Sequence, residues 1–291
     1  MDSFHARTPR SKPATPAAGA AAREGLPRID QLLVERGLAA SRTAAQRLIA
    51  AGRVSWRSAQ GSTLVRKPSE LLPDSAELHV TPDEADRFVS RGGLKLDGAL
   101  ARSGLDVVGM TCLDVGQSTG GFSDCLLQAG AARVIGVEVG HGQLHARLHE
   151  DARCVTLEGI NARELSADQL GAHMPPGGFG LVVCDASFIS LGLLLPRWPA
   201  LLQEGGHVLS LVKPQFEVGP QGVGRGGIVR DASLYPQVEA RIRDTCGTHG
   251  LQVLDYFDSP ITGSDGNREF FVFAQRGNTA ALHEATSRIT S

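Results

Sequence analysis

The sequence predicts a doubly wound α/β domain, preceded by a smaller α+β domain. From residue 88 onwards, strand-like and helix-like runs alternate, which is the pattern of a largely parallel sheet with helices on both faces. Residues 26–87 instead hold two short helical runs followed by short β-prone runs. We therefore divide the chain into a disordered arm at 1–25, a small domain with its linker at 26–87, the α/β domain at 88–277 and a C-terminal tail at 278–291.

Composition narrows the class of protein. The chain has 291 residues, of which 42% are hydrophobic and 21% charged, so it can bury a full-sized core. Its five cysteines lie far apart without a C-x-x-C pair, which favours reduced thiols over a zinc cluster or a disulfide framework. No apolar run approaches the roughly 20 residues that span a bilayer. We therefore expect a cytoplasmic protein that holds no metal and does not enter a membrane.

Charge is distributed unevenly along the chain. Residues 28–67 contain seven Arg, one Lys and two acids, a net charge of +6, whereas residues 68–291 carry a net charge of −10. A basic module joined to an acidic one is typical of a protein that faces nucleic acid through the basic part. The chain also has 25 Arg but only four Lys, so each lysine raises the question of why arginine would not serve there.

The small domain begins with apolar residues at helical spacing, and Gly37 ends this first helix. Ser41 precedes a second helical run at 42–51 and is a suitable N-cap for it. Short β-prone runs complete the domain, at 54–56, 62–65 and 77–80.

Basic side chains can share one exposed side of this helix pair. For Arg42, Arg47 and Arg53, composition alone leaves a solvated face and a phosphate-binding face equally open. The stretch LPRIDQLLVERGLAASRTAAQRLIAAGRV, whose R-x-D-x-L-L opening starts at Arg28, resembles the alpha-L RNA-binding motif of the ribosomal S-four family. That resemblance implies that the helix pair and the following hairpin bind structured RNA, with these four arginines as contacts.

In the α/β domain, short apolar runs alternate with amphipathic ones. Strands are expected at 112–115, 133–139, 153–157, 181–185, 207–212, 252–257 and 269–274, with helices between most of them, including 121–129 and 234–245. The connection between the last two strands is too short for a crossover, which predicts a hairpin.

The turn after the first of these strands is rich in glycine. Its sequence, LDVGQSTGGFSDCLLQAG, is not the G-x-G-x-x-G fingerprint, which makes a nicotinamide cofactor less favoured. A tight turn without function remains one alternative. The other is a ligand site, because Asp114, Glu138 and Asn161 lie at the ends of the first three strands, where such folds bind ligands. S-adenosylmethionine would satisfy all three, with Glu138 on its ribose and the others at its amino-acid and adenine ends.

Four further polar residues form a second constellation. Asp185 and Lys213 end two consecutive strands, Glu269 begins the last strand, and Lys95 lies in the helix before the first strand. A surface charge or a helix cap is the simpler interpretation of each residue alone. Two of the four lysines belong to this set, however, and lysine can lose its proton when buried beside another cation, which arginine cannot. That property suits a general base.

The motifs SRGGLKL, LDVGQSTGGF, CDASF, LVKPQFE, VGRGGIVRD and GNREFF together resemble the TlyA family, whose catalytic half is similar to the FtsJ-type ribose methyltransferases with their Lys-Asp-Lys-Glu tetrad. The resemblance implies a Rossmann-like methyltransferase sheet and places the tetrad on Lys95, Asp185, Lys213 and Glu269. The implied cofactor loop consists of Gly116, Ser118, Thr119, Gly120, Gly121 and Phe122. The chain departs from the family at Gln117, where Ala is usual, and at Glu138, where Asp is usual.

We therefore expect an S-adenosylmethionine-dependent RNA 2′-O-methyltransferase that acts on ribosomal RNA or ribosomal subunits without a metal. Lys213 would take or relay the 2′-hydroxyl proton, Asp185 would orient Lys213, and Glu269 would hold Lys95 and the ribose. The glycine-rich segment 214–231, with Arg225, is either a cover over the RNA or a surface loop. The alternative functions are a non-catalytic ribosome-assembly factor and a membrane-lytic haemolysin, since such proteins often carry haemolysin names.

Overall fold

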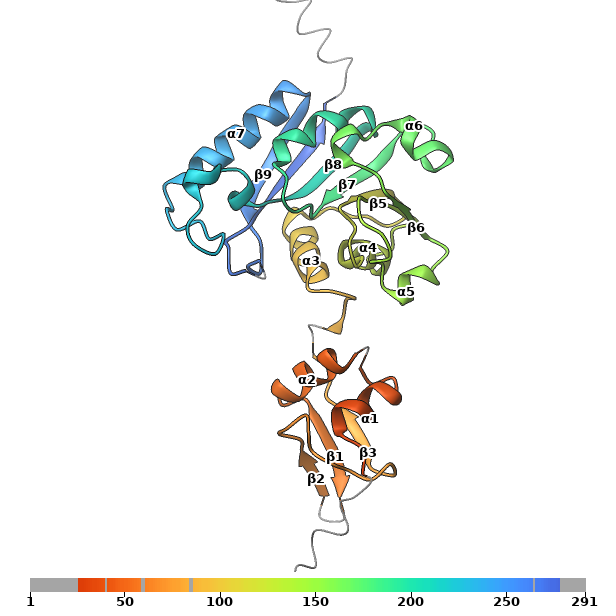
Figure 1. Cartoon of the computed structure of the whole chain (residues 1–291). Coiled ribbons are helices and arrows are strands. Elements are labelled where there is room, and N and C mark those ends of the chain that lie inside the picture. Colours follow the sequence, from red (N-terminus) through yellow and green to blue (C-terminus); the bar gives the residue numbers. More distant parts are fainter. Residues whose placement is uncertain (1–25, 40, 59–60, 84–85, 264, 278–291) are drawn as a thin grey trace, which may run out of the picture. The chain divides into compact units, whose positions relative to one another are not determined.

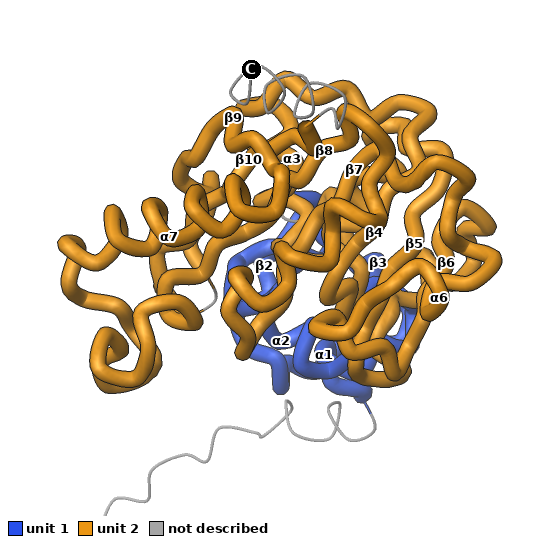
Figure 2. Tube along the Cα trace, turned by 90° about the horizontal axis from the view of Figure 1, so that it is seen from above, with its two compact units in different colours: residues 1–83 blue, residues 84–291 orange. Residues whose placement is uncertain are grey.

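The computed structural model describes residues 26–277 apart from 40, 59–60, 84–85 and 264. The chain forms two compact units, Met1–Asp83 and Glu84–Ser291, which are coloured separately in Figure 2. The boundary between the units falls near the end of 26–87, the range predicted to hold the small domain and its linker. The predicted arm and C-terminal tail lie outside the described residues.

The first unit packs two helices against a three-stranded antiparallel sheet. Helix α1 (Ile29–Glu35) buries Ile29 and Leu33, and helix α2 (Arg42–Ala50) buries Ile49 against them. Ser41 caps α2 as predicted, because its side chain accepts a hydrogen bond from the backbone N–H of Ala44 at 3.2 Å. The strands, in the order β2-β1-β3, are β1 (Val54–Ser58), β2 (Gly61–Leu64) and β3 (Glu77–Val80).

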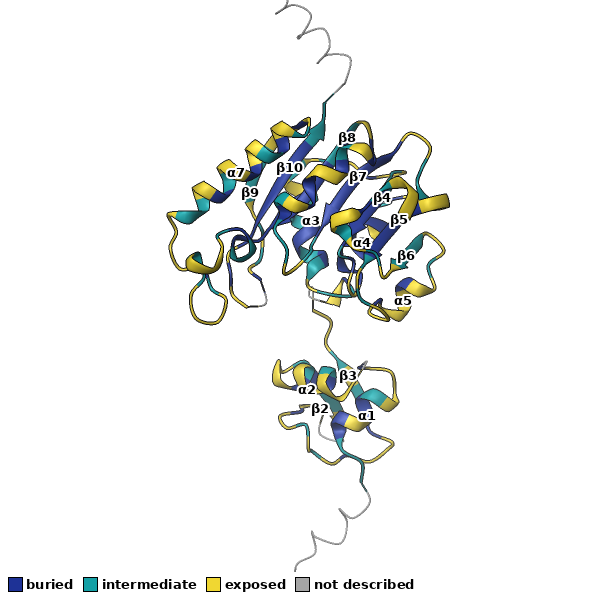
Figure 3. Cartoon of the chain, turned by 45° about the horizontal axis from the view of Figure 1, so that its top comes forward, coloured by how far each residue is buried: buried dark blue, intermediate teal, exposed yellow. Residues whose placement is uncertain are grey.

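The second unit contains a seven-stranded sheet in the order β6-β5-β4-β7-β8-β10-β9 (Figure 1; β4 and β10 are labelled in Figure 3). The first five strands in this order are parallel, and β10 is antiparallel to both β8 and β9. The predicted α/β class and the terminal hairpin are therefore confirmed. The strands are β4 (Thr111–Val115), β5 (Arg133–Glu138), β6 (Cys154–Glu158), β7 (Phe179–Cys184), β8 (Leu202–Val212), β9 (Leu251–Asp258) and β10 (Phe270–Arg276).

Helices cover both faces of this sheet. The main ones are α3 (Gly92–Ser103), α4 (Gly121–Gln128), α5 (Ala146–His149), α6 (Ala167–Leu170) and α7 (Leu234–Thr248). One core cluster joins α3, α4 and α5 to one sheet face, and the other joins α7 and the 191–200 segment to the opposite face. Central strands such as β7 are buried along their whole length, which is why they read as continuous apolar runs (Figure 3). None of the helices in the described ranges has the length and apolar character that a membrane span requires.

The topology collects polar residues at one edge of the sheet. The carboxyl ends of parallel β4, β5, β7 and β8 meet at this edge, and β10 begins there because it runs in the opposite direction. Phe270 at the start of β10 pairs with Val212 at the end of β8. Glu269 and Lys213, which adjoin this pair, are therefore neighbours across the sheet.

Candidate active site

A cavity of about 960 Å³ lies at this edge of the sheet. All four residues of the predicted tetrad line it, as does the whole predicted cofactor set except Gly120. The two constellations, which are separated by long stretches of sequence, therefore face one space. Within the described residues, no group of three or more His, Cys, Asp or Glu side chains is arranged to hold a metal ion.

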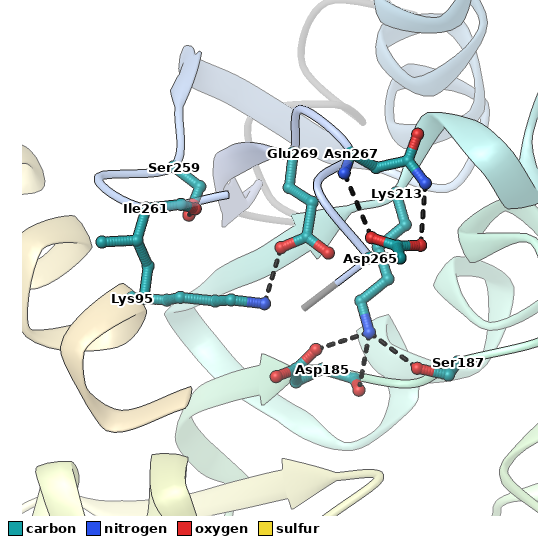
Figure 4. Close-up of polar contacts among 9 residues, drawn as sticks. All are labelled: Lys95, Asp185, Ser187, Lys213, Ser259, Ile261, Asp265, Asn267 and Glu269. Carbon is teal, nitrogen blue, oxygen red and sulfur yellow. Dashed lines mark hydrogen bonds and ion pairs between the residues drawn. The ribbon is translucent and has the colours of Figure 1, made fainter. Parts of the chain in front are cut away.

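Lys95 forms a buried ion pair with Glu269. The distance from Lys95 Nζ to Glu269 Oε2 is 2.6 Å, and the side chains are 10% and 3% exposed (Figure 4). Lys95 lies in the first turn of α3, which crosses closely over the start of α4. A Cβ on Gly121 would lie 2.2 Å from Ser90 Oγ and 3.0 Å from the backbone nitrogen of Gly93, so a larger residue here would require these groups to shift.

Lys213 is held by three oxygens. Its Nζ lies 2.7 Å from Asp185 Oδ1, 2.8 Å from Ser187 Oγ and 3.3 Å from the Asp185 backbone carbonyl oxygen (Figure 4). Nζ thus makes two hydrogen bonds, to Ser187 Oγ and to the Asp185 carbonyl, and an ion pair with the Asp185 carboxylate. The tetrad thus consists of two lysine–carboxylate pairs in one cavity, one at the start of β10 and one at the ends of β7 and β8.

Asp114 is the most buried acid among the predicted cofactor-binding residues. Its Oδ2 accepts a hydrogen bond from Ser123 Oγ at 2.7 Å, whereas its Oδ1 is buried and has no hydrogen-bond partner. Burial raises the pKa of this carboxyl to about 7, and the nearby charges of Asp185 and Glu138 act in the same direction. A donor brought by a ligand would satisfy the unpartnered oxygen.

Glu138 organises the glycine-rich turn. Its carboxylate accepts hydrogen bonds from the backbone N–H of Ser118 and of Gly140, both at 2.9 Å. Gly116 and Ser118 have left-handed backbone conformations, with φ of +78° and +49°, so the chain folds back tightly over the end of β4. Asn161 caps the next short helix by accepting a hydrogen bond from the backbone N–H of Arg163, and it also lines the cavity.

Phe188 is a cavity residue that was not predicted from the sequence. It lines the cavity with 91% of its surface exposed, has a left-handed φ of +64°, and lies 5.4 Å from the ring of Phe216. A bulky residue in this backbone region is uncommon, and such residues are concentrated at functional sites. Its place at the end of the CDASF motif, three residues after Asp185, was the signal that the sequence offered.

Asn267 was also not predicted as a site residue, in spite of its place in GNREFF. It is buried, and its side chain accepts from the backbone N–H of Val229 at 3.0 Å and donates to the Gly227 carbonyl and to Asp265, both at 2.8 Å. It therefore ties the end of the glycine-rich segment to the turn before Glu269; Figure 4 shows its contacts with Asp265. Arg225, in the same segment, is exposed and does not line the cavity.

The arginines expected to contact RNA fall into two groups. Arg28 and Arg42 pair with the buried carboxylate of Asp30, at 2.9 and 3.1 Å, and these contacts hold the pKa of Asp30 far below its usual value. Arg53 donates to the Thr81 carbonyl at 3.0 Å, and Arg47 is exposed on α2. Part of the basic charge therefore joins α1, α2 and the sheet to one another, and the contact with RNA stays a prediction.

The chain is similar to known proteins in both sequence and structure. Residues 88–276 match the FtsJ-like methyltransferases, and residues 27–55 match the S4 domain. The 16S/23S rRNA (cytidine-2′-O)-methyltransferase TlyA of Mycobacterium tuberculosis is 42% identical over 88% of this chain and 92% of its own length. Hemolysin A of Brachyspira hyodysenteriae is 33% identical over 84% and 97%. A solved structure from Streptococcus thermophilus, named a haemolysin, superposes with a TM-score of 0.66 at 38% identity, over 87% of this chain and 89% of that one.

Proposed function

The chain belongs to the TlyA family of FtsJ-like methyltransferases, and we propose that it transfers a methyl group from S-adenosylmethionine to a ribose 2′-oxygen of ribosomal RNA. The observation that carries this proposal is the set of two lysine–carboxylate pairs, one buried and one partly buried, in the same cavity as the glycine-rich turn. A non-catalytic assembly factor would have no use for two lysine–carboxylate pairs that line one cavity, because withdrawing such charges from water carries a desolvation cost.

The residues of the cofactor half fit S-adenosylmethionine. Asp114 has a buried oxygen without a partner, which suits the cationic amine at the amino-acid end. Glu138 lies at the end of β5, where its carboxylate would receive the ribose hydroxyls, and Asn161 would meet the adenine end. When bound, the cofactor supplies a sulfonium methyl group to an attacking oxygen.

Lys213 would act on the proton of the 2′-hydroxyl. Ser187 Oγ lies 2.8 Å from Lys213 Nζ, and a substrate hydroxyl that takes the place of Ser187 would meet the same nitrogen. Asp185 fixes the direction of Nζ through its carboxylate. Glu269 holds Lys95, and this second pair would bind the ribose. Positioning of the two substrates in one cavity supplies the larger part of the rate enhancement.

The target nucleotide would be held outside its helix. Sequence-specific recognition of RNA mostly targets nucleotides whose bases are unstacked and can lie on aromatic side chains. Phe188 presents an exposed ring at the cavity, and a single-stranded base stacks on such a ring. The basic S4 domain would supply phosphate contacts that are independent of this pocket.

The direct test is methyl transfer to RNA. Ribosomal subunits that lack the modification are incubated with the protein and methyl-labelled S-adenosylmethionine, and the RNA is then hydrolysed with alkali. We expect label in alkali-resistant dinucleotides, because a 2′-O-methyl group removes the nucleophile that cleaves the next linkage. Label found only in mononucleotides would place the methyl group on a base and contradict the proposal.

A further inference from the structure

A chain of four side chains runs beneath the glycine-rich turn. Thr156 Oγ1 of β6 donates to Gln117 Oε1, Gln117 Nε2 donates to Ser123 Oγ of α4, and Ser123 Oγ donates to Asp114 Oδ2 of β4, each at 2.7 Å. Gln117 is 3% exposed and its amide also contacts Cys154 Sγ at 3.5 Å. Both ends of the Gln117 amide are therefore engaged inside the protein.

The backbone around Gln117 makes room for this chain. Gln117 lies over Gly136 of β5 on its way to β6, and a Cβ on Gly136 would lie 2.0 Å from Gln117 Cδ. The backbone N–H groups of Gly116 and Gln117 both donate to the Val137 carbonyl, at 2.9 and 3.3 Å. These backbone hydrogen bonds hold the turn in place. The side chain of Gln117 is therefore not needed to fix the path of the backbone.

All three hydrogen bonds in this chain are donated toward Asp114. Each hydroxyl or amide donates toward Asp114, so the donors converge on a single carboxylate oxygen. Asp114 lines the cavity, and its other oxygen is buried without a partner. A carboxylate held at one oxygen keeps a fixed orientation at the other, and buried networks of this kind act more strongly than their separate bonds.

We propose that Gln117 and Ser123 are positioning residues for the cofactor: they hold the Asp114 carboxylate so that its unpartnered oxygen receives the cationic amine of an adenosyl amino acid. This inference rests on the proposed function, because it takes the ligand of Asp114 to be the amino-acid end of the cofactor. It goes further in assigning a role to two side chains that act through Asp114.

Protonation gives the proposal a second readout. Asp114 must be ionised to pair with an ammonium group, and its pKa of about 7 makes the ligand affinity rise between pH 6 and 8. The titratable groups facing it are Asp185 and Glu138, which raise its pKa, and three thiols, whose raised pKa values of about 11 to about 12 keep them neutral in this range: Cys112, Cys154 and Cys184. The hydrogen bond from Ser123 lowers the pKa of Asp114. A variant that weakens this bond should therefore raise the pKa of Asp114, so that ligand affinity rises at a higher pH.

The test compares two ligands that differ at the amino-acid end. S-adenosylhomocysteine carries the amine, whereas 5′-methylthioadenosine lacks it. Calorimetry on the full chain compares wild type with Gln117→Met, which fills the space over Gly136 without donating, and with Ser123→Ala, which breaks the next link. We expect both variants to bind S-adenosylhomocysteine about 5- to 20-fold more weakly, at or below the lower end of the loss for a whole hydrogen bond to a charged group, because Asp114 itself remains. Their affinity for 5′-methylthioadenosine should stay within about twofold of wild type.

Three further results separate the possibilities. The double variant should lose no more than about the larger single loss, because both changes break the same chain, and the affinity of Gln117→Met should rise at a higher pH than that of wild type. Unchanged binding of S-adenosylhomocysteine by Gln117→Met would overturn the proposal, as would an equal loss for both ligands, which indicates a merely structural role in the turn. Wild-type protein that binds neither ligand would overturn the proposed function itself.

Discussion

Replacing Lys213 by arginine separates a role in proton transfer from a role in electrostatics. Lys213 Nζ contacts three oxygens, from the Asp185 side chain, the Asp185 backbone and Ser187, and its side chain is 10% exposed. Arginine keeps the positive charge and offers five donors to the same oxygens, but it stays protonated at any working pH. A variant with arginine can therefore hold Asp185 and the ribose without accepting the 2′-hydroxyl proton.

The expected loss follows from these contacts. Loss of a positioned acid or base typically slows a reaction by about a hundredfold or more, which is roughly 2.7 kcal/mol in the barrier. We expect Lys213→Arg to fold, to bind cofactor and RNA, and to methylate at least about a hundredfold more slowly. Lys95→Arg is the matched control, since it makes the same change in the same cavity at the lysine that pairs with Glu269. Its loss should be clearly smaller.

The assay is single-turnover methyl transfer at saturating RNA and cofactor, which removes differences in binding from the measured rate. Equal binding of cofactor and RNA by both variants is checked by calorimetry and by filter binding. A Lys213→Arg variant with nearly wild-type turnover would refute the role of Lys213 as a general base and leave it as an electrostatic positioner.

Three other perturbations test separate parts of the structure. Removing residues 1–83, the first compact unit, should weaken RNA binding and make its logarithm less dependent on the logarithm of salt concentration, with cofactor binding intact; an unchanged slope would mean that this unit does not anchor the RNA. Glu138→Ala should weaken cofactor binding by roughly 1–3 kcal/mol, since it also releases the N–H groups of Ser118 and Gly140; wild-type affinity in calorimetry would place the ribose contact elsewhere. Because the pKa of Asp114 is raised to about 7 from 3.8, the folded state loses stability as pH rises through this window, and Asp114→Asn should gain up to roughly 4 kcal/mol in free energy of unfolding relative to wild type between pH 4 and 8. Denaturant titrations that give one constant difference across this range would contradict the assignment.

Much of the fold follows from local sequence patterns. Fully buried strands such as β7 consist of consecutive apolar residues, and glycines end several of the helices, so most strands and helices were predicted within a few residues of their observed limits. The insertion of β10 between β8 and β9 was not predicted. Strand order depends on which apolar faces pair across the whole sheet, and the segments themselves carry no local signal for it.

For the site, too, some residues could be predicted from the sequence and others could not. The tetrad was predicted because lysine is rare in this chain and because parallel strands bring their carboxyl ends to one edge. Phe188 and Asn267 were missed for a physical reason: a left-handed φ and a set of contacts to several backbone segments are properties of the folded chain that single residue types do not reveal. The pairing of Arg28 and Arg42 with Asp30 belongs to the same class, because exposed basic residues and structural ones look alike in sequence.

The position of the transferred methyl group is the most direct test of the central claim. RNA from modified ribosomal subunits is digested to nucleosides and analysed by tandem mass spectrometry, with RNA treated with the Lys213→Ala protein as the control. We predict a nucleoside heavier by one methyl group whose base fragment has the unmodified mass, present with wild-type protein and lost with the variant. A methylated base fragment, or equal methylation by the variant, would contradict this claim.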